Sequence, residues 1–190
     1  RTVFEPGMEE FPDDEIRWVT VMFIDVVDST EIAEQIDIEN WRTVLGEAHR
    51  RLGDTVKRWG GEIGQYLGDG LMCYFGARRS QGNDAARAVS CALAMQNTIS
   101  EYHAELQEEY GVEAFLARVG ISTGRVVVGT IGSDQKVDLL AMGATTNLAA
   151  RLQSVCPPAQ VVVDRETYRH TRAEFEFNTL EPTFLKGFAE

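Results

Sequence analysis

Trp18-Val19-Thr20-Val21-Met22-Phe23-Ile24-Asp25 (residues 18–25) is a run of apolar and β-branched residues that ends in a carboxylate, and Val26-Val27-Asp28-Ser29-Thr30 follows it. Such a run is typical of a buried central strand. Asp28-Ser29-Thr30 supplies N-cap residues for a short helix. The segment therefore predicts a strand that leads directly into a helix N-terminus, with Asp25 at the junction.

Asp25 needs an explanation because an isolated buried carboxylate is very costly. It must be paired, protonated or bound to a metal. A helix-capping aspartate or a salt-bridge partner explains this residue, taken alone, as well as a functional role does.

A second carboxylate lies in Gly68-Asp69-Gly70, between two short apolar segments at 62–67 and 71–75. This pattern predicts a β-hairpin with an Asp-Gly turn. Hairpin-turn aspartates are common, so the triplet by itself favours a structural role. In combination, two carboxylates at the ends of adjacent strands are suited to hold two Mg²⁺ or Mn²⁺ ions. Such a pair of ions clamps the attacking and leaving oxygens of an in-line phosphoryl displacement.

A third pattern, Thr145-Thr146-Asn147-Leu148-Ala149-Ala150-Arg151-Leu152, predicts a helix that Pro157-Pro158 stops. Asn147 and Arg151 are four residues apart, so both lie on one face of the helix. An ordinary solvated face accounts for the pair equally well.

The remaining pattern mixes strands and helices and indicates the α+β class, with helices largely on one face of a mixed sheet. We expect residues 1–16 to form a linker or arm and residues 17–190 to form one domain. The expected helices are 40–59 capped by Asn40, one after Asn83 or Asp84, 145–155 and 165–170. Further expected strands are 161–163, 175–178 and 183–186, with a second hairpin, 114–123 and 125–131, turned at Gly124.

Composition excludes several classes of protein. The 190 residues are 44% hydrophobic and 25% charged, as in a soluble globular domain. The formal net charge of −12 opposes binding to nucleic acid. No apolar run reaches membrane-spanning length, and we expect a cytoplasmic setting. Cys73 and Cys91 lie in apolar patterns, where a buried reduced thiol is expected.

The segments 23–30 (FxDxxxST), 68–70 (GDG) and 147–152 (NLAARL) resemble those of a bacterial class III adenylate/guanylate cyclase catalytic domain. Residues 120–129 and 185–188 match that family too, in the same order and spacing. The resemblance implies a ferredoxin-like βαββαβ core with additions, and a head-to-tail homodimer with composite active sites. It also implies conversion of ATP, or GTP, to the 3′,5′-cyclic monophosphate and pyrophosphate, and a further regulatory domain in the full-length protein.

The resemblance also implies roles for individual residues. Asp25 and Asp69 would bind two divalent cations, Mg²⁺ or Mn²⁺. The backbone around Val26, Val27, Asp28, Ser29 and Thr30 would hold phosphates. Arg125, with Lys186 from the second subunit, would bind the triphosphate. Asn147 would orient the ribose, and Arg151 would stabilise charge that develops on the α-phosphoryl oxygens.

The chain departs from the family at four positions. The two purine-reading positions are Gln65, an amide that fits either base edge, and Leu140, which forms no hydrogen bond. We therefore expect weak selectivity between purines. Asp28 stands where the family has glycine, and Ala144 replaces a common aspartate.

Three alternatives to an active cyclase follow from the sequence. A catalytically silent dimerisation or regulatory module of the same fold is the first. A diguanylate cyclase would need a GG[DE]EF loop, which the sequence lacks. A nucleic-acid-binding ferredoxin-like module is disfavoured by the net charge and by the lack of a basic, aromatic sheet face.

Overall fold

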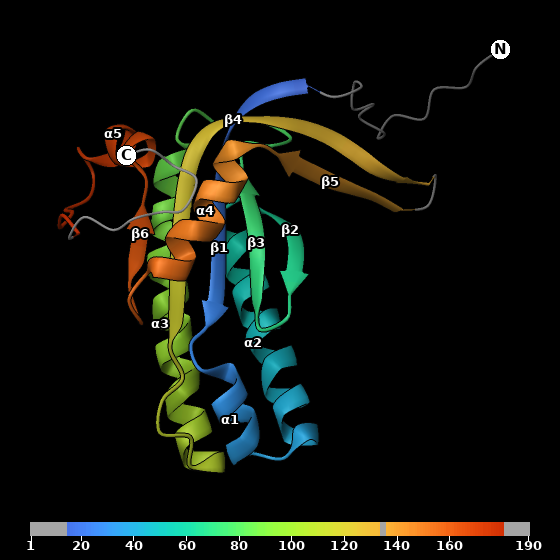
Figure 1. The fold of residues 1–190 in the computed structure, drawn as a ribbon, viewed down its shortest axis with the longest axis vertical. Coiled ribbons are helices and arrows are strands. Elements are labelled where there is room, and N and C mark those ends of the chain that lie inside the picture. The colour runs from blue at the N-terminus through green and yellow to red at the C-terminus, as the bar shows by residue number, and fades with distance from the viewer. Residues whose placement is uncertain (1–14, 134–135, 181–190) are drawn as a thin grey trace.

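Strand β1 (Glu15–Val26) forms the centre of a sheet that the computed structural model describes over residues 15–133 and 136–180 (Figure 1). Within these residues the sheet has six strands in the order β2-β3-β1-β4-β5, and β6 pairs with β4. The other elements are α1 (Ser29–Gln35), α2 (Ile38–Arg58), β2 (Glu62–Leu67), β3 (Gly70–Phe75), α3 (Asp84–Tyr110), β4 (Ala117–Ser133), β5 (Lys136–Met142), α4 (Ala144–Val155), β6 (Val161–Val163) and α5 (Arg165–Thr171).

The first part of the chain has the expected ferredoxin-like arrangement. β1 pairs antiparallel with β3 on one side and with β4 on the other, and β2 lies outside β3. Helices α1 and α2 connect β1 to β2, and α3 connects β3 to β4. The α+β class is confirmed, and β5, α4, β6 and α5 are the additions.

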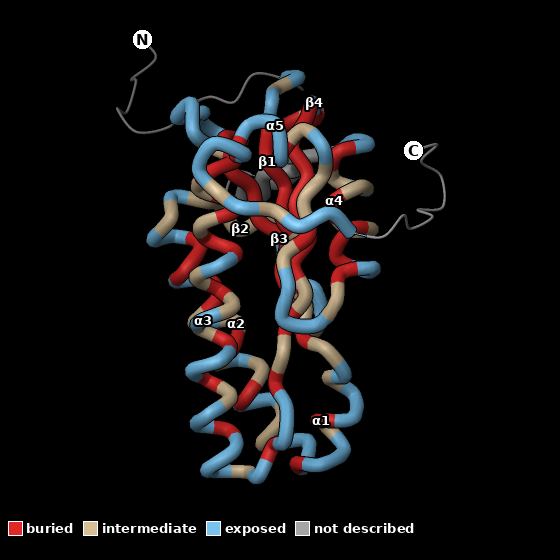
Figure 2. The backbone as a smooth tube through the Cα atoms, turned by 90° about the vertical axis from the view of Figure 1, so that its left-hand side faces the viewer, coloured by how far each residue is buried: buried red, intermediate tan, exposed pale blue. Residues whose placement is uncertain are grey.

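Each face of the sheet contacts a different set of helices. Met22, Ile24 and Val26 of β1 belong to the main core, which the sheet shares with α2 and α3. Val19 and Val21 point to the other face and pack with Ala149 of α4, because successive strand residues alternate between faces. Figure 2 shows α2 and α3 on one side of the buried strands and α4 on the other. The helix layer is therefore not confined to one face.

The prediction of a hairpin that turns at Gly124 is wrong. β4 runs without a turn through this residue, and its hairpin partner is β5. Gly124 lies instead where α4 crosses the strand: a Cβ atom at this position would be 2.5 Å from the Thr145 hydroxyl oxygen. The glycine permits a close helix contact and does not form a turn.

Two further sequence expectations need correction. Asp37, not Asn40, caps α2, because its carboxylate accepts hydrogen bonds from the backbone N–H groups of Glu39 and Asn40 at 3.0 and 2.9 Å. Residues 175–178 form no strand. The expected strand at 183–186 lies outside the described residues, as does most of the expected linker at 1–16; β1 begins at Glu15.

Cys73, Cys91 and Cys156 are free and buried, as expected for Cys73 and Cys91. Burial raises the pKa of Cys91 to about 12, so this thiol stays protonated and unreactive. Over the part of the chain that the structure describes, none of the helices has the length and hydrophobicity needed to cross a membrane.

Candidate active site

Asp25 lies at the C-terminal end of β1, on the face of the sheet that α4 partly covers. Its neighbours in register are Gly70 of β3 and Arg118 of β4. The alternation that sends Val21 toward α4 also sends Asp25 to that face. The hydrophobic residues of β1 fix the backbone. Asp25 is the last residue of the strand on this face, so its carboxylate lies at the edge of the core.

Asp69 lies next to Asp25 because the β2–β3 hairpin turns beside the end of β1. Gly70 has no room for a side chain: a Cβ atom there would be 2.0 Å from the Ile24 carbonyl oxygen and 3.0 Å from Asp25 Cβ. Gly68 has φ +56°, a left-handed conformation that favours glycine. Gly70 is therefore required by a close contact and Gly68 by its backbone conformation. Together they hold Asp69 next to the end of β1.

The pKa of Asp25 is raised, chiefly because the carboxyl is partly buried. The guanidinium of Arg118 opposes this rise, and the negative charge of Asp69 adds to it. Arg118 Nε and Nη2 donate to the two Asp25 carboxylate oxygens at 3.3 and 3.4 Å. These distances exceed the usual length of a charge-assisted hydrogen bond, so the arginine satisfies the carboxylate only in part.

Sequence reasoning missed Arg118. The signal that points to it is a lone cation within the apolar strand segment Ala117-Arg118-Val119, the counterpart of the lone carboxylate in β1. Only the strand register reveals that the two charges face one another.

His49 of α2 was missed as well. Its ring lies 4.9 Å from that of Tyr66, behind the turn that holds Asp69. Burial lowers the pKa of His49, while the Gly70 backbone and the Asp69 carboxylate act in the opposite direction. The imidazole therefore supports the turn in its neutral form.

The Asp25 and Asp69 carboxylates fit a site for divalent cations. Both are hard oxygen donors, and their mutual repulsion is what a cation would relieve. Within the described residues there is no group of three or more histidine, cysteine or acidic side chains that could hold a metal ion. Such a cation would therefore need other oxygen ligands, such as water and phosphate.

The segment after Asp25 makes a sharp change of direction. Asp28 is the N-cap residue of α1 and adopts a left-handed conformation with φ 53° and ψ 35°, and its side chain makes no capping hydrogen bond. This conformation explains why a glycine suits the position. The Val27 N–H donates to the Leu116 carbonyl oxygen at 2.8 Å and is therefore already engaged. Ser29 and Thr30 begin the helix.

Helix α4 presents two different faces. Thr145, Ala149, Leu152 and Gln153 are its buried residues and lie against the sheet. Asn147 is exposed and Arg151 partly exposed, and both lie on the opposite side of the helix from Ala149. The structure therefore brings Asp25 and Asp69 together, whereas Asn147 and Arg151 lie on the opposite side of α4 from the residues that contact the sheet, with Arg151 Nη1 buried.

The other expected site residues have distinct positions. Gln65 is exposed and pairs with Met72, which places it on the same sheet face as Asp25. Arg125 pairs with Trp18, seven residues along β4 from Arg118, or roughly 23 Å at the usual strand rise. The structure therefore does not bring Arg125 to the carboxylates. Leu140 of β5 pairs with Gly129 of β4, but the side chain of Leu140 lies outside the described part of the structure, as does Lys186.

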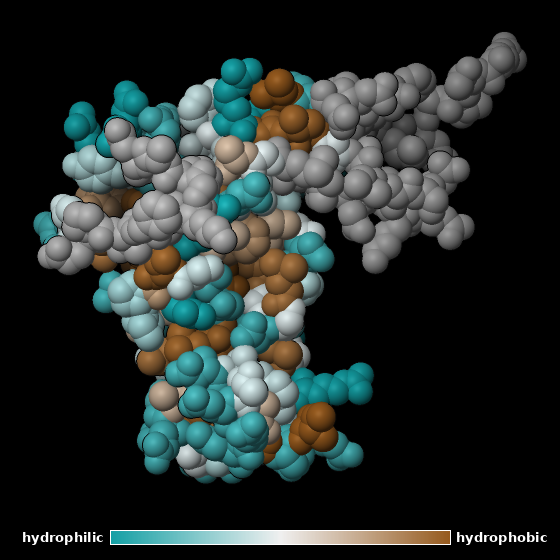
Figure 3. Space-filling view, viewed as in Figure 1, coloured by the Kyte–Doolittle hydropathy of each residue, from teal (hydrophilic) through white to brown (hydrophobic). Residues whose placement is uncertain are grey.

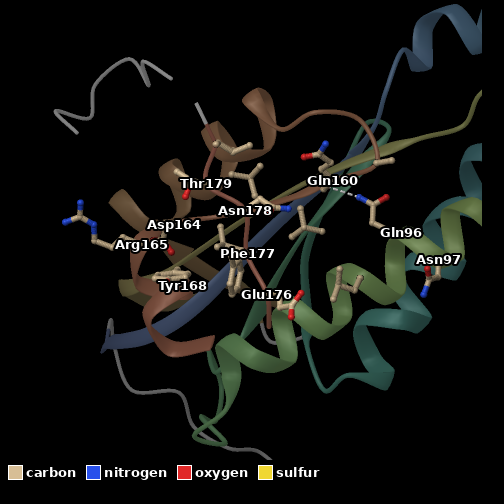
Figure 4. A pocket seen from close by; sticks show the side chains of 16 residues that line it. Gln96, Asn97, Gln160, Asp164, Arg165, Tyr168, Glu176, Phe177, Asn178 and Thr179 are labelled. Carbon is tan, nitrogen blue, oxygen red and sulfur yellow. Dashed lines mark hydrogen bonds between the residues drawn. The ribbon is translucent and has the colours of Figure 1, made fainter. Parts of the chain in front are cut away.

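A cavity lies away from the carboxylates. It has a volume of about 900 Å³ and lies between α3, β6 and α5, lined by residues that include Gln96, Asp164, Tyr168 and Phe177 (Figure 4). Gln96 Nε2 there donates to the Gln160 carbonyl oxygen at 2.9 Å. The Asp25 carboxylate is partly buried, and Figure 3 shows apolar areas among the polar ones on the α4 face.

Known proteins have similar sequences and a similar fold. The family described as the adenylate and guanylate cyclase catalytic domain matches residues 11–190. Adenylate cyclase 1 of Rhizobium meliloti is 33% identical over 137 residues, which are 72% of this chain and 20% of that protein. Adenylate cyclase 2 of the same organism is 29% identical over 153 residues, 80% of this chain and 41% of that protein. The chain thus spans less than half the length of these relatives.

Two solved structures are similar throughout. The adenylyl cyclase CyaB from P. aeruginosa superposes with a TM-score of 0.88 at 27% identity, over 94% of this chain and 92% of that one. The guanylyl cyclase Cya2 superposes with a TM-score of 0.87 at 29% identity, over 94% and 90%. The family match over residues 11–190 and the similarity in sequence and fold agree, and the chain belongs to the adenylate and guanylate cyclase catalytic domain family.

Proposed function

We propose that the chain is the catalytic domain of a homodimeric nucleotide cyclase, which converts ATP, and also GTP, to the 3′,5′-cyclic monophosphate and pyrophosphate. The observation that carries the proposal is the placement of Asp25 and Asp69 side by side at the ends of neighbouring strands. Their two carboxylates would hold divalent cations, Mg²⁺ or Mn²⁺. When bound, such cations activate the ribose 3′-hydroxyl and neutralise the leaving pyrophosphate.

The protein groups would bind and orient the nucleotide. Arg118 forms an ion pair with Asp25 and has a guanidinium suited to phosphoryl oxygens, so we assign to it the triphosphate contact expected of Arg125. The start of α1, at Ser29 and Thr30, would face the phosphates. Gln65 would contact the purine, with Leu140 as an apolar neighbour that does not distinguish the bases.

The second half of the site would come from another copy of the chain. Asn147 and Arg151 lie on the outward face of α4, where a neighbouring subunit can receive them. In a head-to-tail pair they would meet the carboxylates of the other subunit, with Lys186. Asn147 would then orient the ribose, and Arg151 would stabilise the charge that develops during in-line attack.

The decisive test is an assay of the purified dimer with Mn²⁺ and either ATP or GTP, in which the cyclic product is quantified. We expect product from both nucleotides, and a loss of at least about a hundredfold when Asp25 or Asp69 becomes asparagine. A folded dimer that makes neither product would favour the silent regulatory module.

Arg118 and Arg125 form a matched pair of variants in one strand. Arg118→Ala should raise the KM for the nucleotide or lower kcat by about tenfold or more, because a charge-assisted phosphate contact is lost. Arg125→Ala should leave both constants within a factor of about two. The reverse pattern would return the phosphate contact to Arg125.

A further inference from the structure

Gln153 of α4 is the polar side chain that lies against the Asp25 region and has no evident structural purpose. The residue is buried, with 9% of its surface exposed. Its Nε2 is fully buried and has no acceptor in hydrogen-bonding geometry within the described residues. Nevertheless the amide influences the carboxylate, since it acts to lower the pKa of Asp25. A buried amide with an unused donor is costly and needs an explanation.

The backbone around Gln153 is tightly fixed. A Cβ atom at Gly120 would lie 2.2 Å from the Gln153 backbone nitrogen and 2.4 Å from the Ala149 carbonyl oxygen. Helix α4 therefore contacts β4 directly, two residues from Arg118, which is the register neighbour of Asp25. The backbone of Gln153 therefore has little freedom to move away from β4.

Arg118 and Gln153 offer Asp25 two donors of different kinds. The guanidinium repels a cation that approaches the carboxylate, whereas a neutral amide does not. The long contacts of Arg118, at 3.3 and 3.4 Å, also leave Asp25 with acceptor capacity to spare. Once Arg118 turns to a phosphate, the Gln153 amide is the remaining donor close to the carboxylate.

We propose that Gln153 is a positioning residue: when a divalent cation binds, its unused Nε2–H donates to one Asp25 carboxylate oxygen and thereby holds the carboxylate in the orientation that the cation requires. This inference rests on the proposed cation site at Asp25 and Asp69. Outer hydrogen bonds to metal-binding carboxylates have this effect in proteins generally, and their loss weakens metal affinity.

The experiment measures Mn²⁺ binding to the 190-residue chain by electron paramagnetic resonance, with and without a non-reactive nucleoside triphosphate analogue. Gln153→Met removes the amide and keeps the length of the side chain, and Gln153→Leu is the second variant. We expect both to bind Mn²⁺ about tenfold more weakly than wild type and to change the spectrum of the bound ion. Ser154→Ala, next to Gln153 on the exposed side of α4, should match wild type.

Thermal denaturation without metal separates positioning from a structural role. The unsatisfied amide costs stability, so the metal-free melting temperature of Gln153→Met should equal or exceed that of wild type. Wild-type Mn²⁺ affinity in both variants, or a lower metal-free melting temperature in both, would overturn the inference. Asp25→Asn tests the cation site itself: if it binds Mn²⁺ as wild type does, the proposed function fails regardless of Gln153.

Discussion

Asp25 is a residue whose charge is unfavourable in the metal-free protein. Its pKa in the folded protein is raised above the ordinary value of 3.8. Between the ordinary and the raised pKa, the native state therefore binds more protons than the unfolded state. The free energy of unfolding therefore falls as the pH rises through this window, and the cost persists at neutral pH. A bound cation offsets that cost, which links the stability of the protein to its proposed ligand.

This linkage predicts the behaviour of Asp25→Asn. At pH 7 without metal, the variant should unfold at a higher temperature than wild type, and the difference should vanish below about pH 4, where the wild-type carboxyl is protonated in both states. Added Mn²⁺ should stabilise wild type alone. Asp54→Asn, which removes an exposed carboxylate from α2, is the control in these thermal denaturation experiments. A variant less stable than wild type at pH 7 would show that the attraction between Arg118 and the Asp25 carboxylate outweighs the cost of burying that carboxylate.

Asp28 predicts a gain of function. Its left-handed backbone favours glycine, and its exposed carboxylate lies at the start of α1, where phosphates are proposed to bind. Asp28→Gly should increase the free energy of unfolding by up to about 1 kcal/mol and lower the KM for the nucleotide. Asp28→Asn removes only the charge and should lower KM with a smaller change in stability. An unchanged KM in both variants would mean that this carboxylate points away from the phosphates.

At the scale of the elements, the contact of α4 with β4 at Gly120 places Gln153 beside Asp25. Gly120→Ala would force a methyl group to within 2.4 Å of two backbone atoms of α4. We expect a loss of about 3 kcal/mol in the free energy of unfolding, together with loss of activity. Gly46→Ala in α2, with nothing within 4 Å, should instead stabilise by about 1 kcal/mol in the same denaturant titration. Equal effects of the two substitutions would refute the close contact.

The elements also show where sequence reasoning succeeds. Hydrophobic periodicity and turn residues predicted β1, the β2–β3 hairpin, α3, α4, β6 and α5 correctly, because local chemistry determines each of them. Gly124 was misread because a glycine in an apolar strand signals either a turn or a close contact, and only the position of α4 separates the two. Arg118 was missed for the same reason, since its partner is 93 residues away in the sequence.

At the scale of the molecule, we propose that one chain holds two incomplete halves of a site. Asp25, Asp69 and Arg118 lie on the sheet side that α4 partly covers, and Asn147 and Arg151 lie on the opposite side of α4 from Ala149. The net charge of −12 opposes binding of a triphosphate unless cations and these arginines offset it locally. The motifs predict the residues of each half, and the folded chain brings Asp25 and Asp69 together and leaves Asn147 exposed on α4.

Complementation between variants tests the central claim, a site shared by two chains, most directly. Asp25→Ala and Arg151→Ala should each be inactive as homodimers. Their equimolar mixture should recover about one quarter of wild-type cyclase activity, because half of the randomly formed dimers are mixed and each mixed dimer has one intact site of two. A mixture of Asp25→Ala with Asp69→Ala, which damages the same half twice, should stay inactive. No recovery in the first mixture, with subunit exchange verified, would contradict the shared site.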